Sequence, residues 1–259
     1  MTEKISLSVV VAAKNSAGCI ADCLKSVDWA GEIIVFDDLS SDNTAEIAKQ
    51  FTDKIVRRSP DITGKSSIVT YDAAAFDWIL SLDPDERVTP ELRDEIIALL
   101  KSGPTCNGYM IPRKIFMGSV WVRYGGLYPS LRLKLFKKNT VNSGEPTEIE
   151  AQAHMKNVWG TLQNDILCFA YRDFTEAITK LDRETDLEAK RWFHEKKRIS
   201  ILGALIKTLI NFWSAYFLKR GRKDGVIGLF LSVNAGMYYF LSFAKYWELK
   251  KEKTGKDKV

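Results

Sequence analysis

Two short acidic stretches follow apolar runs in this chain of 259 residues, and they are its clearest candidates for chemistry. Asp37-Asp38 comes directly after one apolar run, and Asp83-Pro84-Asp85 comes after another. Carboxylates two residues apart in an irregular segment can approach one divalent cation, and such cations take carboxylate and phosphate oxygens as ligands. A diphosphate leaving group needs this kind of charge neutralisation. The pattern therefore suits a nucleoside-diphosphate substrate, although Asp-Pro-Asp-Glu by itself is more often a turn before a helix.

The apolar runs before these carboxylates predict buried strands of one sheet. We expect strands at residues 7–13, 32–36, 54–56 and 77–82, and helices at 19–27, 44–51 and 89–100. Thr89 is the expected N-cap of the last helix, and Pro90 its first helical residue. Strands that alternate with helices predict a mostly parallel α/β sheet. Ligands of such sheets bind at the carboxyl ends of the strands, where the acidic stretches lie.

The composition and the cysteines restrict the class of protein. A chain with 46% hydrophobic and 27% charged residues can bury a core, which excludes a disordered chain. With four cysteines and two histidines, we expect free buried thiols rather than disulfides or a zinc site. The apolar run Ile5–Ala13 is short and β-branched, so we expect a strand there rather than an export signal. These features predict a cytoplasmic catalytic part.

The charge of the chain is divided between a body and a tail. Residues 1–186 carry 22 basic and 27 acidic side chains, a net charge of −5, whereas residues 187–259 carry 16 and 6, a net +10. The tail contains two apolar segments, Ile199–Leu218 and Val226–Ala244, separated by the basic run Lys219–Lys223. Each is long enough to span a bilayer, but Lys207 makes spanning by the first one costly, so both could also be interfacial amphipathic helices.

The tail therefore predicts a membrane partner. Basic clusters beside apolar segments attract anionic lipid, and the aromatic residues of the tail resemble interfacial anchors. The alternative is a pair of buried helices that pack on the catalytic body. Nothing in the tail resembles a nucleic-acid-binding module, so we expect no nucleic-acid partner.

Several segments together resemble a known family in their order and spacing. They are Val9–Asn15, Ala30–Thr44, Asp77–Val88, Tyr124–Pro129, Leu133–Phe136, Tyr216–Gly221, Asp224–Gly225 and Phe243–Glu248. These residues resemble family 2 glycosyltransferases and, more closely, the bacterial lipopolysaccharide-core β-glucosyltransferases. The resemblance covers nearly the whole chain and implies a GT-A fold, a Rossmann-like αβα sandwich with a mostly parallel sheet. The C-terminal helical extension would associate with the membrane.

The resemblance also implies roles for individual residues. Donor-binding roles fall on Lys14, Asn15, Asp37, Asp38, Ser40, Asp42, Asp83, Arg132 and Lys134. Acceptor-binding roles fall on Trp121, Tyr124, Gly125, Gly126 and Tyr128. Asp85, with Asp83, would hold a divalent Mg or Mn ion on the diphosphate. Glu86 fits a charge at a helix end as well as it fits a site residue.

The general base is the weakest part of the resemblance. The subgroup has a His-Glu pair after its Leu-Phe strand, and the matching pair here is Thr147-Glu148. Glu148 is our candidate for the base that deprotonates the acceptor hydroxyl, with Glu150 and Asp165 as weaker alternatives. The positions of the subgroup's Gln and Arg are Arg132 and Lys134, which keep positive charge but change its geometry.

The sequence thus predicts a catalytic domain at residues 1–186 and a membrane-associating region at residues 187–259. Residues 1–100 would bind the nucleotide sugar and residues 101–186 the acceptor. We expect an inverting, metal-dependent glycosyltransferase at the cytoplasmic face of the bacterial inner membrane. Its expected donor is a UDP-sugar and its acceptor a lipid-linked glycan. The alternatives are a polyprenyl-phosphate glycosyltransferase and a catalytically degenerate nucleotide-sugar-binding membrane protein.

Overall fold

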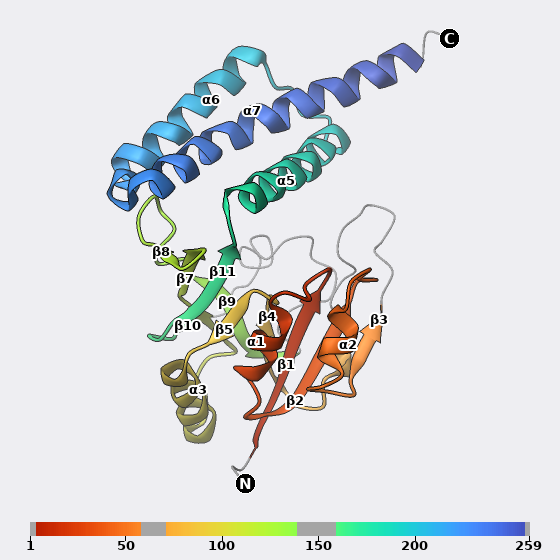
Figure 1. The fold of residues 1–259 in the computed structure, drawn as a ribbon, viewed down its shortest axis with the longest axis vertical. Coiled ribbons are helices and arrows are strands. Elements are labelled where there is room, and N and C mark those ends of the chain that lie inside the picture. The colour runs from red at the N-terminus through yellow and green to blue at the C-terminus, as the bar shows by residue number, and fades with distance from the viewer. Residues whose placement is uncertain (1–3, 58–70, 139–158, 257–259) are drawn as a thin grey trace. The chain divides into compact units, whose positions relative to one another are not determined.

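The computed structural model describes residues 4–57, 71–138 and 159–256. The chain clusters into two compact units, Met1–Lys114 with Pro129–Cys168, and Ile115–Tyr128 with Phe169–Val259. Unit 1 contains most of the strands, and unit 2 contains the long C-terminal helices (Figure 1). The chain passes between the units three times: inside strand β7 (Arg113–Met117), after Tyr128, and inside strand β11 (Ile166–Tyr171).

A seven-stranded sheet forms the centre of unit 1. Its strand order is β10-β6-β9-β4-β1-β2-β3. The strands are β1 (Ile5–Ala13), β2 (Ala30–Asp37), β3 (Ile55–Arg57), β4 (Trp78–Leu82), β6 (Gly108–Ile111), β9 (Arg132–Lys137) and β10 (Gly160–Thr161). Strands β4, β1, β2 and β3 are parallel, whereas β9 runs antiparallel to both β4 and β6. The mixed, mostly parallel sheet confirms the predicted fold class.

Three helices contribute to the core on one face of this sheet. They are α1 (Ile20–Lys25), α2 (Thr44–Ala48) and α3 (Pro90–Ser102). The core there joins Leu7, Val9 and Val11 of β1 to apolar residues of the three helices. On the opposite face, Val10 packs in a cluster with Ala74, which follows the short helix η1 (Tyr71–Ala73). The period of two along β1 therefore places successive side chains in two separate cores.

A smaller sheet of four strands has the order β5-β11-β7-β8, with β5 at Glu86–Val88 and β8 at Val120–Val122. Strand β5 follows the acidic turn after β4 and pairs antiparallel with Ile166–Cys168 of β11. Thr89 then caps α3, because its side chain accepts a hydrogen bond from the Leu92 N–H at 3.2 Å. The predicted start of this helix is confirmed.

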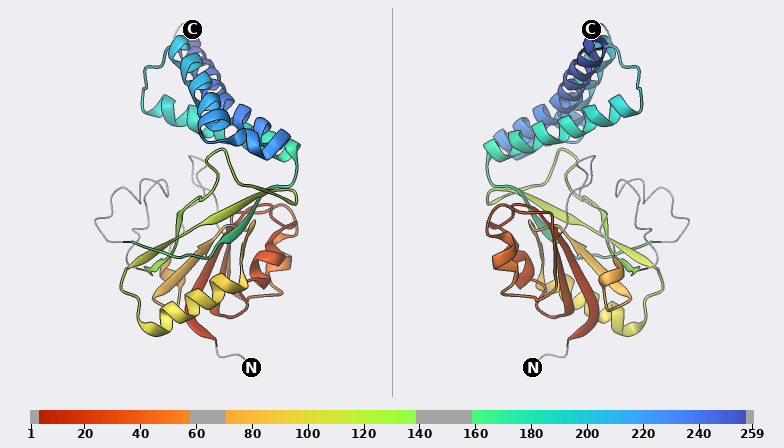
Figure 2. Two further views of the ribbon diagram at one scale, coloured as in Figure 1. Left: turned by 90° about the vertical axis from the view of Figure 1, so that its left-hand side faces the viewer. Right: turned by 90° about the vertical axis from the view of Figure 1, so that its right-hand side faces the viewer.

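Unit 2 is built from three long helices, α5 (Phe174–His194), α6 (Ile201–Trp213) and α7 (Gly225–Lys256). Figures 1 and 2 show them lying side by side. A π-helical turn, η3 (Ser214–Leu218), continues α6, and a 3₁₀ turn, η4 (Gly221–Asp224), leads into α7. Gly236 of α7 lies where an added Cβ would come within 2.9 Å of the Thr208 carbonyl oxygen, so α6 and α7 pack with their backbones close together.

The helical segments Ile201–Leu218 and Gly221–Glu252 are long and apolar enough to cross a membrane, by length and composition alone. Core helices of soluble proteins pass the same test, so this is weak evidence. Of the residues in the two apolar windows, however, 11% and 28% are buried. Neither window therefore has the enclosed surroundings of a core helix.

Candidate active site

The carboxyl ends of β1, β2 and β4 meet at one edge of the large sheet. Ala13 pairs with Asp37, and Val11 pairs with Leu82, the residue before Asp83. The two acidic stretches therefore lie on the strands that flank β1. This arrangement follows from the parallel register, because parallel strands end at the same edge.

The loop after β2 is held against the loop after β1 by a set of hydrogen bonds. The Asn15 N–H donates to Ser40 Oγ at 2.9 Å, and Asn15 Oδ1 accepts from the Ser41 N–H at 2.8 Å. Asp42 accepts from the Ala17 N–H at 3.1 Å and also bonds Thr44. Asn15 adopts a positive φ of 49°, a conformation that Asn tolerates better than most residues. Several predicted donor-binding residues thus form one fixed structure.

Asp37 lies at the base of this structure and is completely buried. Its Oδ1 accepts from the Ser40 N–H at 3.1 Å. Its Oδ2 is 3.6 Å from Arg57 Nε and accepts no hydrogen bond from any described residue. A buried carboxylate oxygen without a hydrogen bond is energetically costly. A ligand that donates a hydrogen bond to this oxygen would therefore stabilise the site.

The turn after β4 contains a buried ionic network. Lys134 of β9 is 1% exposed, and its Nζ lies 3.0 Å from Asp83 Oδ2 and 2.8 Å from Glu86 Oε2. Glu86 Oε1 accepts from Arg113 at 3.1 Å, and Glu86 Oε2 accepts from the Asp83 N–H at 2.9 Å. Arg113 also donates to Ser130 Oγ at 3.2 Å. The backbone of the acidic turn is thus fixed by a buried glutamate and a buried lysine.

The two carboxylates of this network differ in their surroundings. The Asp83 side chain is half-exposed, and the Lys134 ammonium lowers its pKa, with smaller contributions from Arg113 and Arg132. Glu86 is fully buried, and burial raises its pKa although Lys134 and Arg113 oppose this effect. Asp83 is therefore an ionised group open to a ligand, whereas Glu86 is a structural group within the turn.

The donor set of this turn fits a divalent cation that also binds a diphosphate. In the part of the chain that the structure describes, no three His, Cys, Asp or Glu side chains gather closely enough to hold a metal alone. Asp83 and the half-buried Asp85 offer two carboxylates in one turn. Mg²⁺ is commonly held by one or two carboxylates, with substrate phosphates and water as its other ligands.

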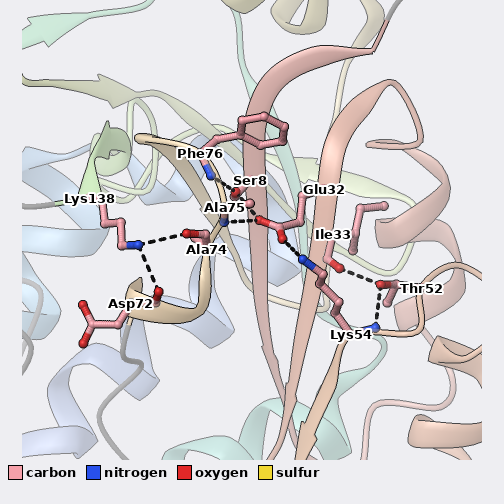
Figure 3. Close-up of polar contacts among 10 residues, drawn as sticks. All are labelled: Ser8, Glu32, Ile33, Thr52, Lys54, Asp72, Ala74, Ala75, Phe76 and Lys138. Carbon is pink, nitrogen blue, oxygen red and sulfur yellow. Dashed lines mark hydrogen bonds and ion pairs between the residues drawn. The ribbon is translucent and has the colours of Figure 1, made fainter.

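A second network supports the opposite end of β2 (Figure 3). The buried Glu32 accepts hydrogen bonds from Ser8 Oγ, from Lys54 Nζ and, at 2.8 Å, from the Ala75 N–H. Burial alone would raise the pKa of Glu32, but these hydrogen bonds outweigh it and lower the pKa. The network ties the segment before β4 to β1 and β2, which fixes the strand that leads to Asp83.

The predicted acceptor loop lies in unit 2, between β8 and Tyr128. Tyr124 donates its N–H to Asp224 Oδ2 at 2.7 Å, and Gly125 donates its N–H to the Lys219 carbonyl at 2.9 Å. Gly125 and Gly126 have φ values of 71° and 85°, which favour glycine. Trp121 packs edge-on against Tyr128, with ring centroids 5.3 Å apart. The loop is therefore held by the turn between α6 and α7.

The structure brings together the predicted residues of the strand ends, and it brings the predicted acceptor residues together in their own loop. Lys14 is exposed beyond β1, and Arg132 is half-buried at the start of β9. Glu148 and Glu150 lie outside the described residues. The third base candidate, Asp165, has a side chain that is 11% exposed and pairs with Lys114 at 2.9 Å.

Sequence reasoning missed the partners that position the site. Glu86 is neither a solvent-exposed charge nor part of a helix, but a buried member of β5. Arg113 was not predicted at all, and no local motif identifies it. Asp224 and Lys219 belong to segments that carry the family resemblance, but their contact with the acceptor loop needs the fold.

Comparisons with known proteins agree with this architecture. Residues 8–156 match glycosyl transferase family 2, a range that includes the strand-end carboxylates. The lipopolysaccharide core biosynthesis glycosyltransferase LpsC of Rhizobium meliloti is 21% identical over 259 residues, covering 96% of this chain and 94% of LpsC. An uncharacterized glycosyltransferase of Rickettsia prowazekii is 28% identical over 258 residues, covering 94% of this chain and 87% of that protein.

Among solved structures, the mannosyltransferase PcManGT from Pyrobaculum calidifontis, in complex with GDP-Man and Mn²⁺, has a TM-score of 0.54 to this chain. The two are 13% identical, and the match covers 95% of this chain and 88% of that one. This similarity supports the shared GT-A fold. The chain belongs to glycosyl transferase family 2 and is a homologue of lipopolysaccharide core glycosyltransferases.

Proposed function

We propose that this protein transfers a sugar from a nucleotide-diphosphate sugar to a hydroxyl group of a lipid-linked or lipopolysaccharide-core glycan. The observation that carries the proposal is the Asp37 carboxylate. It is completely buried at the end of β2, with an Oδ2 that accepts no hydrogen bond from the described residues. Hydroxyl or N–H groups of a nucleoside would satisfy that oxygen. Asp83 and Asp85 lie after the strand on the other side of β1, so one ligand with a nucleoside and a diphosphate suits both.

The reaction we assign is a single displacement with inversion at the anomeric carbon. The acceptor hydroxyl oxygen attacks that carbon, the bond from the carbon to the diphosphate oxygen breaks, and the nucleoside diphosphate leaves with the electron pair. Glu148 is our candidate for the base that takes the hydroxyl proton. Asp165 is less suitable, because its carboxylate is mostly buried and paired with Lys114.

A Mg²⁺ or Mn²⁺ ion at Asp85 and Asp83 would neutralise charge on the departing diphosphate. The other roles belong to the chain itself. Lys134 and Arg113 hold the turn, and Arg132 and the exposed Lys14 add positive charge for the phosphates. The Asn15–Ser40 contact holds the first two strand-end loops in one conformation for the nucleoside. We infer a UDP-sugar as the donor.

We also propose that the protein works at the cytoplasmic face of the bacterial inner membrane. Two observations support this location: the two long apolar helical segments with little burial, and the relationship to a lipopolysaccharide core glycosyltransferase. A lipid-linked acceptor would then be reached at the same surface.

The test of the donor site is Asp85→Asn, with Asp94→Asn on the exposed surface of α3 as the matched control. We expect the Asp85 variant to lose sugar transfer and to lose Mn²⁺-dependent UDP binding in calorimetry, while the control keeps both. A nucleotide-sugar panel in a thermal-shift assay identifies the donor, because a ligand at 100 times its Kd stabilises the fold by about 2.7 kcal/mol. Normal transfer by Asp85→Asn would show that the assigned metal role is wrong.

The acceptor class is tested by product analysis. The full chain is incubated with the donor and either a lipopolysaccharide-core acceptor or a polyprenyl phosphate, and products are identified by mass spectrometry. Our proposal expects a new glycosidic bond on a sugar hydroxyl. A sugar phosphodiester would contradict it, and nucleotide binding without any turnover would point to a degenerate transferase.

A further inference from the structure

The outward face of α6 is apolar along its whole length. Ala204 is buried on the inner side of the helix, and Ala215 is buried in the η3 turn that follows. The residues that point away from this inner side are Leu202, Leu205, Ile206, Leu209, Ile210 and Trp213 of α6 and Phe217 of η3. All seven are exposed large hydrophobic residues, and Leu209 is 68% exposed. A surface helix in water normally exposes polar residues, whereas this helix exposes an apolar face.

The charge of this segment is turned away from the apolar face. Lys207 is the sole charged residue of Ile201–Leu218. Its Nζ lies 4.6 Å from the centre of the Tyr239 ring of α7, so the lysine points along the side of α6 toward its neighbour. Because Lys207 points away from the apolar face, its charge does not prevent that face from contacting lipid. The exposed face itself carries no charge.

Helix α5 lies beside α7 (Figures 1 and 2). Phe174 packs edge-on against Phe230 with centroids 4.7 Å apart, and Trp192 lies 4.9 Å from Tyr239. Lys245 of α7 forms an ion pair with Asp182 of α5 at 2.7 Å. The charged residues of α5 are Glu176, Lys180, Asp182, Arg183, Glu184, Asp186, Glu188, Lys190 and Arg191.

This pairing argues against α7 as a membrane span. If α7 crossed the bilayer in this fold, α5 would lie at the same depth and its charged residues would enter the hydrocarbon. Charged side chains at that depth are strongly disfavoured. The ion pair Lys190–Asp186 lies on an exposed part of α5, as expected for a helix in water.

Basic residues lie at both ends of α6. Lys196, Lys197 and Arg198 precede it, and Lys219, Arg220, Arg222 and Lys223 follow it; all seven are exposed. Anionic lipid headgroups attract such clusters. In a hairpin that spans the bilayer, the two clusters would lie on opposite sides. In a helix that lies in the interface, both would lie on the same side.

We propose that the α5–α7 unit is a monotopic membrane platform. The apolar face of α6 enters the acyl layer of one anionic leaflet, both basic clusters contact its headgroups, and α5 stays in water. This inference rests on the membrane location proposed above and specifies how the protein occupies it. The occupant of the apolar face is lipid, because both ends of the face carry positive charge and the face itself carries none.

The first test measures topology in bacterial cells with a permeabilised outer membrane. Arg198→Cys and Arg222→Cys, one in each cluster, are treated with a membrane-impermeant maleimide before and after lysis of the inner membrane. We expect both to be labelled only after lysis. The unmodified chain has four free cysteines and serves as the control for sealed cells. Labelling of either engineered cysteine in sealed cells would overturn the monotopic arrangement.

The second test measures binding of the full chain to vesicles by flotation. Leu209→Glu places a charge on the apolar face, and Asn211→Glu places the same charge on an exposed polar position of the same helix. On vesicles with anionic phosphatidylglycerol we expect at least a tenfold loss of binding for Leu209→Glu and less than a threefold loss for Asn211→Glu. Equal binding by the two variants would overturn the proposal.

Two further measurements distinguish lipid binding from dimerisation and from loss of the catalytic site. If Leu209→Glu left vesicle binding intact but converted a dimer into a monomer, the face would be an interface between two copies of the chain, and our assignment would be wrong. Hydrolysis of the donor in solution tests the glycosyltransferase site independently of lipid. We expect Leu209→Glu to keep it, so failure of the membrane inference differs from failure of the proposed function.

Discussion

Replacing Lys134 with methionine tests whether the buried network holds the acidic turn. Methionine keeps most of the volume of the lysine but removes its charge. Glu86 would then be fully buried with Arg113 as its main cationic partner. A buried carboxyl group that has lost one of its two cationic partners can lower the cost of its charge by taking up a proton. The loss in free energy of unfolding that the substitution causes through Glu86 therefore cannot exceed the free energy needed to protonate Glu86.

That limit follows from the pH. Glu86 has an ordinary pKa of 4.5, and each pH unit above that value adds about 1.36 kcal/mol to the free energy of protonating the carboxylate. At pH 7 the largest cost through Glu86 is thus about 3.4 kcal/mol, and at pH 5 it is about 0.8 kcal/mol. Asp83 adds less to the cost than Glu86, because its half-exposed carboxylate is screened by water. The loss of stability should therefore shrink as the pH falls.

The assay is urea unfolding of the full chain, followed by tryptophan fluorescence, at pH 7 and pH 5. Lys137→Met, an exposed lysine on the same strand, is the matched control and should change stability by less than about 0.5 kcal/mol. The double variant Lys134→Met, Glu86→Gln should recover most of the stability at pH 7, because one carboxylate, Asp83, then remains for the one cation, Arg113. An equal loss at both pH values would refute the reasoning.

Three other contacts can be tested by single substitutions. Thr89→Ala removes the cap on the Leu92 N–H and should cost about 1 kcal/mol in the same assay. Glu32 has a lowered pKa, so its contribution to the free energy of unfolding is present above pH 4.5 and lost as the pH falls below it. The free energies of unfolding of wild type and Glu32→Gln should therefore differ at pH 7 and converge toward pH 3. Asp224→Ala frees the Tyr124 N–H and should raise the acceptor KM while donor binding stays unchanged, whereas Asp224→Asn should keep the acceptor contact.

The strand-end site was predictable because it depends on local patterns. Buried strands followed by acidic residues place Asp37 and Asp83 at one edge once the strands are parallel, and the observed register confirms the shared edge. The Thr89-Pro90 cap is also a local signal. Both features need only the chain within a few residues and the general rules for parallel sheets.

The partners of that site were not predictable in the same way. Glu86, Arg113 and Lys134 lie on three different strands, and the sequence around each one says nothing of the others. Helix α7 was also longer than its apolar segment suggested, since it continues to Lys256. The Lys- and Glu-rich end has high helix propensity, so a helix that begins in an apolar segment can continue through it.

The contacts of the acceptor loop connect the two proposals of membrane attachment and acceptor binding. Tyr124 and Gly125 donate their N–H groups to Asp224 and to the Lys219 carbonyl, both in the turn between α6 and α7. That turn carries one of the two basic clusters that we assign to the headgroups. If α6 lies in the leaflet, the loop is then anchored beside the lipid surface by backbone hydrogen bonds rather than by a flexible linker. A glycan attached to lipid would then lie close to Tyr124. A variant that weakens lipid binding should therefore raise the KM for a lipid-linked acceptor more than the KM for the same glycan freed from its lipid.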